Sequence, residues 1–506
     1  MTARHLLPAI AAAALLLTAP AASSQDLRMA TSFAVESLDP ISDGFWMQEF
    51  GVGEMLMQFR EDGGFYPWLL SDLRLDGETR WVLTLREGIR FHNGNRLDAE
   101  AVHAAIAHQL DHSAGARGSF PDDARFTVTG EYELTFETDA PFPALPALLA
   151  DETVFLIYDV AAVDASGSDD GALAAAGIYT GPYRIDTLDA DTLTLSRFDQ
   201  YWQGMPALEE VSVHFISDTN ARLLAVQNDE IDIALFMPIA VVPVIEATPG
   251  LHFSADTPSA NSYSTFLNLR EPPFDDPRVR RAFALAIDYD SIAKDIFSGL
   301  FQPATSFYAS LYRFAVDNLA TDTERAAQLL DEAGWLMGPD GVRYRDGQPL
   351  RLSILYNPGV SDLVALTTGL QAQLHPHGFV VEPRGVPDTY AAYGEPGWNA
   401  GVHNQSSGGN GVPELFLRRH FTPDGDRNYG GYDNPEITEL ANRLSTTTGE
   451  AERHQLLERI QTIMIEEDVG FLILVDSRLG VVSNDRYASY RPGFYFFNLD
   501  WQTQPD

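Results

Sequence analysis

The chain has 506 residues, 45% of them hydrophobic, which is too long for one ordinary domain and too apolar for wholesale disorder. It carries 72 acidic and 33 basic residues, and the net charge of −39 excludes nucleic acid and anionic lipid as favourable partners. It contains no cysteine, which excludes disulfides, thiol catalysis and cysteine-ligated metal.

The N-terminus has the pattern of a secretion signal. Arg4 and His5 precede an apolar stretch from Leu6 to Leu17, and small residues follow up to Ser23. The apolar stretch is too short for a membrane-spanning helix, which needs about 20 residues. We therefore expect residues 1–25 to be a cleaved signal peptide. Because no cysteine is available for a lipid anchor, we expect a freely diffusing periplasmic protein.

Strand and helix patterns then alternate along the first half of the chain. Residues 81–91 alternate apolar and polar side chains, a turn follows at 92–95, and Asp98 is placed to cap an amphipathic helix. Another strand is predicted at 132–136. Two short strands at 183–185 and 193–195 flank a polar turn and predict a hairpin, and a helix beginning near Arg222 precedes a short strand at 230–233.

The second half contains three clear helix patterns, from Pro277 to near Phe297, from Asp322 to Ala333, and from Ala451 to near Glu466. Two extended apolar runs, at 264–269 and 472–482, are candidates for crossings between two lobes. The irregular alternation of strands and helices predicts α/β lobes with mixed sheets.

Several motifs, read in order, resemble the family 5 extracellular solute-binding proteins, the peptide- and nickel-binding receptors of ABC importers. The stretches that resemble family elements, in residue type and in order along the chain, are Ser37-Leu38-Asp39-Pro40, Trp81 to Gly94 with Leu97 to Val102, Gly181-Pro182-Tyr183, Phe198 to Trp202, Asp218 to Arg222, Phe266 to Phe283, Ala326 to Trp335, and Gly431 to Asn434.

The resemblance implies an α/β, two-lobe periplasmic-binding-protein fold of type II, with three subdomains, mixed sheets and a hinge. The lobes would be 26–262, with an inserted subdomain at about 65–178, then 263–480, with a return to the first lobe at 481–506. It also implies a monomeric receptor without cofactor, which captures a small solute and delivers it to the permease subunits of an ABC importer.

Enzyme motifs are absent from the sequence. No nucleophile elbow, His-Glu-x-x-His motif or phosphate-binding loop occurs. His108 and His112 are four residues apart on one predicted helix and could share a metal, but no third ligand is defined. A zinc-dependent hydrolase is therefore only a remote alternative.

The ligand site is less well defined by the sequence. Relative to the family's peptide-binding and nickel-binding members, the aspartates and the arginine that hold ligands are missing, and Asp151 and Glu152 stand where that arginine would be. Their charge favours a cationic group on the ligand. The candidate binding residues are therefore Arg117, Asp151, Glu152, Tyr390, Trp398, His403, Asn404 and Glu414. A peptide or other amine-bearing solute, a nickel or other metal chelate, an opine, and a sugar all stay open.

Overall fold

The computed structural model describes residues 25–60, 63–167, 169–255, 258–408, 411–493 and 499–506, and leaves the side chains of residues 45, 152, 153, 258 and 260 undescribed. The predicted signal peptide lies outside the described residues apart from Gln25. No helix in the described ranges is long and apolar enough to cross a membrane.

A seven-stranded mixed sheet joins the N-terminal strand to a strand near the C-terminus. Its strand order is β10 (Tyr183–Leu188), β11 (Thr192–Arg197), β12 (Glu210–Phe215), β1 (Asp26–Thr31), β13 (Ile233–Ala234), β24 (Val481–Asn484) and β14 (Leu251–Ser254). β1 pairs in parallel with β12 and β13, whereas β24 pairs antiparallel with β13 and β14. The chain therefore returns to its first sheet after more than 220 residues elsewhere, at β24.

A four-stranded antiparallel sheet forms a second layer in the N-terminal half. Its order is β5 (Leu70–Asp76), β6 (Arg80–Leu85), β8 (Glu133–Glu137) and β7 (Arg125–Gly130), and two small antiparallel pairs, β2 (Glu54–Met55) with β9 (Leu156–Ile157) and β3 (Met57–Phe59) with β4 (Phe65–Pro67), lie beside it. Helix α1 (Ala99–His112) packs its apolar face into the same core. The predicted strand at 132–136 and the helix capped by Asp98 are confirmed, and Asp98 accepts a hydrogen bond from the Ala101 N–H at 3.1 Å.

Further helices of this half cover the two sheets. They are α2 (Ala114–Gly118), α3 (Leu145–Leu148), α4 (Glu152–Phe155), α5 (Val160–Ser166), α6 (Asp170–Ala176), α7 (Thr219–Gln227) and α8 (Val242–Glu246). The predicted hairpin is β10 with β11.

A six-stranded mixed sheet is the centre of the other half. Its order is β16 (Gln302–Pro303), β23 (Phe471–Arg478), β15 (Pro258–Leu267), β22 (Ala400–Ser406), β20 (Arg351–Tyr356) and β21 (Val380–Gly385), and a small sheet of β17 (Leu336–Met337), β18 (Arg343–Arg345) and β19 (Gln348–Pro349) lies at its edge. The helices here are α9 (Pro277–Ala286), α10 (Tyr289–Ser291), α11 (Thr323–Glu332), α12 (Ser361–Leu374), α13 (Thr389–Ala392), α14 (Pro413–Phe421), α15 (Pro435–Leu444) and α16 (Glu450–Thr462).

We call residues 25–255 with 481–506 the first unit and residues 258–478 the second unit. The chain passes from one unit to the other between β14 and β15, and returns between β23 and β24. The predicted run at 264–269 lies largely within β15, inside the second unit, so the first change of sheet occurs earlier than expected; the run at 472–482 spans the second change of sheet.

One predicted helix is shorter than expected. The pattern from Pro277 to near Phe297 forms α9, which ends at Ala286, followed by the single turn α10 and a π-helical segment over Ile292–Ile296. The break occurs because Ile287 is extended and Asp288 starts a new turn, its carboxylate accepting from the Ser291 N–H at 2.9 Å.

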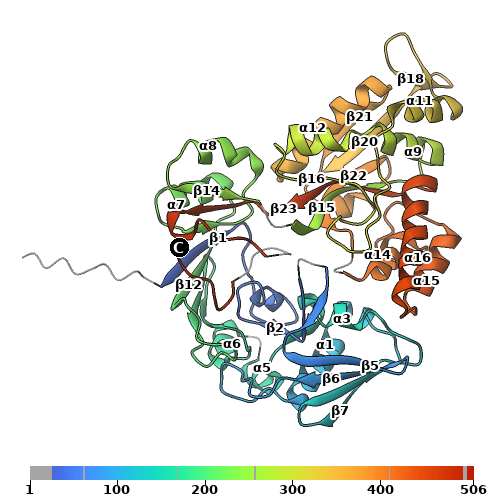
Figure 1. The fold of residues 1–506 in the computed structure, drawn as a ribbon. Helices are drawn as coiled ribbons and strands as arrows, with labels where there is room; N and C mark the ends of the chain where they lie inside the picture. The colour runs from blue at the N-terminus through green and yellow to red at the C-terminus, as the bar shows by residue number, and fades with distance from the viewer. Residues whose placement is uncertain (1–24, 61–62, 168, 256–257, 409–410, 494–498) are drawn as a thin grey trace, which may run out of the picture.

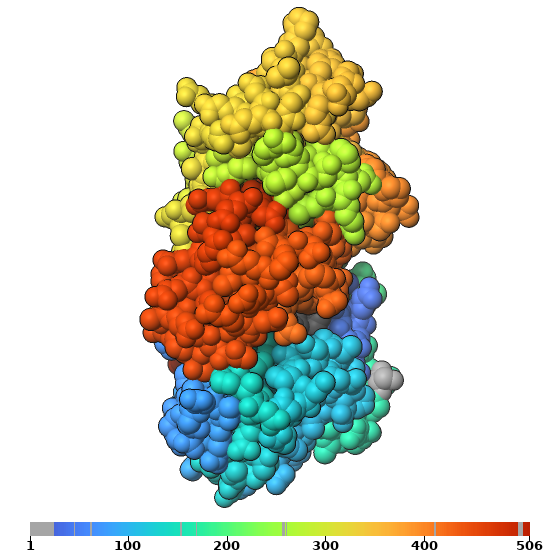
Figure 2. Space-filling model, turned by 90° about the vertical axis from the view of Figure 1, so that its right-hand side faces the viewer, coloured from blue at the N-terminus to red at the C-terminus, as the bar shows by residue number. Residues whose placement is uncertain are grey.

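The two units touch along one side. In Figure 1 the four-stranded sheet lies at the bottom, the seven-stranded sheet at the left and the six-stranded sheet at the upper right. Figure 2 shows the orange helical region of the second unit resting on the blue and teal residues of the first. Val412 of the second unit is buried in the same core as α1, and the ring of Phe59 in the first unit lies 6.1 Å from that of Tyr312 in the second. The two units are therefore in direct contact along this side.

Candidate ligand-binding site

A cavity of about 380 Å³ lies where the two units meet. Its first-unit wall comes from the α2 region, with Gly115 and Ser119, and from the start of α4, with Asp151 and Val154. Its second-unit wall is formed by Tyr390, Gln405, Ser406, Leu415, Phe416, Arg419, His420 and Arg427. The size lies within the range of small-molecule pockets, about 300–1,000 Å³. We call this space the inter-unit cavity.

Helix α14 supplies the largest share of the second-unit wall. Phe416, Arg419 and His420 are spaced three and four residues apart and therefore lie on one face of the helix. Gln405 and Ser406 end strand β22, and Tyr390 stands on the short helix α13, which Asp388 caps by accepting from the Ala391 N–H at 3.0 Å. Rigid elements thus hold most of the polar groups of this wall.

Two arginines make the second-unit wall cationic. The guanidinium of Arg419 donates to both carboxylate oxygens of Asp426, at 3.0 and 2.7 Å, so its charge is already paired. Arg427 is exposed, and no carboxylate in the described ranges lies within ion-pair distance of it. Arg427 is therefore available to an anionic group of a ligand.

His420, one of the residues of this wall, has an unused lone pair on its ring. Its Nδ1 lies 3.0 Å from the Phe416 carbonyl oxygen, which can only accept, so Nδ1 carries the proton and Nε2 does not. Burial lowers the pKa of His420 to about 4, so the ring is neutral at pH 7. Nε2 is buried and has no hydrogen-bond partner among the described residues, and the same holds for Gln405 Nε2. Two residues of the cavity wall therefore each carry one polar atom that is buried and unmatched among the described residues.

Asp151 is the acidic group on the opposite wall. It is 9% exposed, and its backbone carbonyl starts the turn of α4 by accepting from Val154 and Phe155. The cavity thus combines a carboxylate from the first unit with cationic groups from the second. A ligand between them would meet opposite charges on its two sides.

The structure brings together only some of the residues proposed from sequence. Asp151 and Tyr390 line the inter-unit cavity; Glu152 is next to it in sequence, but its side chain lies outside the described part of the chain. Asn404 is exposed at a different cavity, beside Tyr263 and Asp362. His403 is buried on β22 behind Tyr390, hydrogen-bonded to the Tyr393 hydroxyl, and burial lowers its pKa to about 3.

Three of the proposed residues have other roles. Trp398 is 1% exposed and packs on Tyr393 with ring centroids 4.5 Å apart, so it belongs to the core and not to a cavity wall. The guanidinium of Arg117 donates to the carbonyls of Leu110 and Asp111 at 2.9 and 2.6 Å, and so caps the end of α1.

Glu414 is the third proposed residue with another role. Its carboxylate is almost fully buried and accepts two hydrogen bonds from Arg453, at 3.2 and 3.1 Å. The pair lies beside a different cavity, lined by aromatic and proline side chains of both units. The sequence prediction did not include Arg453, which is distant in sequence, and ligand contact by Glu414 stays a prediction.

Sequence reasoning missed Arg419, His420 and Arg427. The stretch Leu417-Arg418-Arg419-His420-Phe421 lies on an amphipathic helix just after the predicted second-unit loop, and its basic residues were the available signal.

The two histidines considered for a metal pair with protein groups. His108 Nδ1 lies 2.8 Å from the Tyr158 hydroxyl, and His112 Nδ1 lies 2.8 Å from the His108 carbonyl, with the two rings stacked at 4.2 Å. Within the described ranges, no group of three or more His, Asp or Glu side chains is placed to hold a metal ion.

The family model for bacterial extracellular solute-binding proteins, family 5, matches residues 64–428. The chain belongs to this family. The chain is 24% identical over 486 residues to the nickel-binding protein NikA of Staphylococcus aureus, covering 95% of this chain and 94% of that one. It is 26% identical over 521 residues to the glutathione-binding protein GsiB of Pectobacterium atrosepticum, covering 97% and 96%.

Solved structures show the same fold. NikA from Brucella suis in complex with Fe(III)-EDTA superposes with a TM-score of 0.83 at 22% identity, covering 95% of this chain and 100% of that one. The oligopeptide-binding protein AppA of Bacillus subtilis, in complex with a nonapeptide, superposes with a TM-score of 0.71 at 20% identity, covering 92% and 95%. These results confirm the two-lobe binding-protein fold and the family. The chain is a substrate-binding protein of an ABC importer, and not an enzyme.

Proposed function

We propose that this receptor captures a zwitterionic solute derived from amino acids, such as a short peptide or an opine, in the inter-unit cavity. The observation that carries the proposal is the charge arrangement: Asp151 stands on one wall, and Arg427 and Arg419 stand on the other. A ligand amine would face Asp151 and a ligand carboxylate would face Arg427. The sequence alone favoured a cationic ligand; the two arginines add the need for a carboxylate.

The unmatched groups of the cavity fit the same class of solute. Both atoms are buried in this structure, so His420 Nε2 would accept from a ligand N–H, and Gln405 Nε2 would donate to a ligand carbonyl or carboxylate oxygen, after the side chains turn toward the cavity. Buried polar groups are normally hydrogen-bonded, so these two are matched when a ligand with both donors and acceptors is present. One relative is a glutathione-binding protein, and another has been solved in complex with agropinic acid.

A second candidate is the same kind of solute carried as a metal chelate. The neutral Nε2 of His420 is a suitable ligand for nickel or zinc. A metal in this cavity would need most of its ligands from the chelator, since the described residues offer no group of three ligating side chains. A relative has been solved with nickel bound to L-histidine, which is a chelate of this type.

The proposal includes a place and a partner. The protein would act in the periplasm after removal of residues 1–25, as a monomer, and would deliver its ligand to the permease subunits of the importer. The two units would be the lobes, opening about the two places where the chain changes sheet, between β14 and β15 and between β23 and β24. Intact-mass measurement of the secreted protein tests the processing: an N-terminus between Ala22 and Asp26 without added lipid mass is expected, and retained Met1 or a lipid mass contradicts it.

A thermal-shift and calorimetric screen tests the ligand class. The panel contains dipeptides, glutathione, agropinic acid, and L-histidine with and without nickel. A bound ligand at a hundred times its Kd stabilises the native state by about 2.7 kcal/mol. The expected hit carries both an amine and a carboxylate.

Two variants with matched controls connect the hit to the cavity. Asp151→Asn and Arg427→Gln are expected to weaken binding about 30-fold or more and about tenfold, respectively, because each removes a charge facing the ligand. Asp290→Asn and Arg384→Gln alter exposed charges away from this cavity and are expected to leave the affinity unchanged. A panel without any hit, or equal losses in the variants and their controls, contradicts the proposal.

A further inference from the structure

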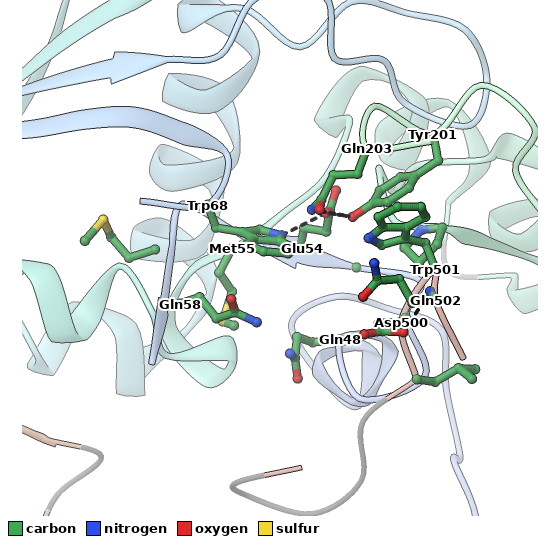
Figure 3. A pocket seen from close by; sticks show the side chains of 15 residues that line it. Gln48, Glu54, Met55, Gln58, Trp68, Tyr201, Gln203, Asp500, Trp501 and Gln502 are labelled. Atoms are coloured by element: carbon green, nitrogen blue, oxygen red, sulfur yellow. Dashed lines mark hydrogen bonds between the residues drawn. The ribbon is translucent and has the colours of Figure 1, made fainter. Parts of the chain in front are cut away.

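A second cavity, of about 320 Å³, lies entirely within the first unit. Its lining residues come from three segments: residues 48–68 around β2 and β3, Pro182 with the loop at 201–203, and the C-terminal residues 499–502. Figure 3 shows the side chains gathered around one space, with Gln48 and Gln58 on one side and Trp501 and Gln502 on another. No described residue of the second unit lines it, so its described lining does not depend on contact between the two units. We call it the first-unit cavity.

Glu54 fixes the aromatic part of this cavity. The carboxylate is 5% exposed, and its Oε1 accepts from Trp68 Nε1 at 2.8 Å, from the Tyr201 hydroxyl at 2.8 Å and from Trp202 Nε1 at 3.1 Å. The ring of Trp68 also meets that of Trp202 edge to face, with centroids 5.6 Å apart. These bonds hold Trp68 and Tyr201 in one orientation at the cavity wall. An aromatic wall that is already ordered loses little entropy when a ligand packs on it.

The remaining polar groups of the cavity are mostly side-chain amides. Gln203 donates to the Tyr201 hydroxyl at 3.2 Å, whereas the amides of Gln48, Gln58 and Gln502 make no hydrogen bond to another residue of the described chain. Each amide carries two donor hydrogens and an acceptor oxygen, and can therefore bind a hydroxyl group in either sense. Trp501 adds a second, partly exposed indole near these amides.

Charge is nearly absent from the lining. Among the described residues, no arginine, lysine or histidine lines the first-unit cavity, so none of its described side chains would neutralise a carboxylate or phosphate. Of its two acidic residues, Glu54 is covered by its donors, and Asp500 Oδ1 accepts from the backbone of Gln502 and from Thr503. This differs from the inter-unit cavity, whose lining contains both a carboxylate and guanidinium groups.

We propose that the first-unit cavity is a second binding site, for a neutral hydroxyl-rich solute of the size of a mono- or disaccharide. Indole and phenol rings would cover the apolar C–H face of such a molecule, and the four glutamine amides would match its hydroxyl groups. The absence of cationic side chains from the described lining disfavours anionic solutes there. The site is independent of the inter-unit cavity and of the ligand proposed for it.

Titration calorimetry of the full-length mature protein with glucose, maltose, sucrose and glycerol tests this site. At least one of the three sugars is expected to bind with one-to-one stoichiometry. Trp501→Ala and Gln502→Ala are expected to weaken that binding at least tenfold and threefold, respectively. Gln502 is exposed, so its substitution leaves the fold intact even if Trp501→Ala does not.

Arg427→Gln separates this site from the inter-unit cavity. It is expected to leave sugar binding unchanged, and Gln502→Ala is expected to leave binding of the amino-acid-derived solute unchanged. Lack of binding by all three sugars overturns the proposal. Sugar binding that Arg427→Gln weakens and Gln502→Ala does not overturns it too, since the sugar would then occupy the inter-unit cavity.

Discussion

The inter-unit cavity and the first-unit cavity differ in how much of the chain must assemble before they exist. The inter-unit cavity combines Asp151 of the first unit with Arg427 of the second, so it exists only where the two units are in contact. The first-unit cavity is complete within one unit. A site between two bodies can open and close on its ligand, whereas a site inside one body is preformed.

Each of the two cavities has a buried carboxylate nearby, and the two carboxylates have different kinds of partner. Glu54 is surrounded by neutral donors, two indoles and a phenol, and burial raises its pKa. Glu414, at the start of α14, is paired with the guanidinium of Arg453. The first arrangement orients aromatic rings, and the second ties α14, which carries much of the inter-unit wall, to α16.

Loss of the Glu414–Arg453 pair should have the largest effect on the free energy of unfolding. Glu414→Ala is expected to destabilise the protein by about 3 kcal/mol or more, because it leaves a partly buried guanidinium without its carboxylate. Urea unfolding at pH 7 measures this. Glu414→Leu with Arg453→Met is the control, and should recover part of the loss. A change below about 1 kcal/mol would show that the pair does not hold α14.

Removal of the Glu54 carboxylate should reduce the free energy of unfolding by less than loss of the Glu414–Arg453 pair. Glu54→Ala is expected to destabilise the protein by about 2 kcal/mol, since three donors lose their acceptor but water in the cavity can replace part of it. Glu54→Gln retains an acceptor oxygen and should cost less than Glu54→Ala. Equal losses in the two variants, measured by urea unfolding, would contradict the role assigned to the oxygen.

The two arginines of the inter-unit cavity should contribute unequally to the affinity for the ligand. Arg427→Gln is expected to weaken binding of a carboxylate ligand about tenfold, or about 1.4 kcal/mol, and Arg419→Gln less, because Asp426 already pairs with Arg419. Calorimetry with the hit of the ligand screen measures both. A larger loss for Arg419→Gln would reverse the assignment of the anion contact.

The smallest effect is a pH dependence of stability in the second unit. Burial lowers the pKa of His403 to about 3, whereas an unfolded histidine titrates near about 6.5. Between these values the unfolded chain binds a proton that the native state does not. The stabilisation is therefore complete above pH 6.5 and is lost as the pH falls below it.

Between pH 7 and pH 5.5, His403 alone should account for about 1 kcal/mol of lost stability. Urea unfolding of the wild type and of His403→Asn at both pH values measures this contribution. The variant should show the smaller decrease between the two pH values. An identical decrease in both proteins would mean that His403 does not carry the titration.

Parts of the fold followed from local sequence patterns because the responsible interactions are local. Asp98 caps α1 three residues away, and the β10–β11 hairpin closes over the short turn at 189–191. The length of α9 did not follow, because its last turn ends where Ile287 is extended and its carbonyl accepts from the Thr321 hydroxyl, 34 residues away. The apolar pattern continued past a break that a distant residue stabilises.

The candidate site was only partly predictable for the same reason. Asp151 and Tyr390 were proposed and line the inter-unit cavity, but Trp398 and Glu414 were proposed as well and are buried in the second unit. An aromatic or acidic residue near a loop has the same appearance in sequence whether it faces a cavity or the core. Arg453, which pairs with Glu414, is 39 residues further along the chain.

The sequence by itself determined the family, the α/β class and the absence of an enzyme motif, since these depend on the order and type of residues along the chain. Only the tertiary structure decided which charges face each other. Asp151 and Arg427 are 276 positions apart in sequence and belong to different units, and the proton on His420 Nδ1 is placed by the carbonyl of Phe416 on the folded helix. A binding site depends on distances between side chains, and these distances are set when the units pack.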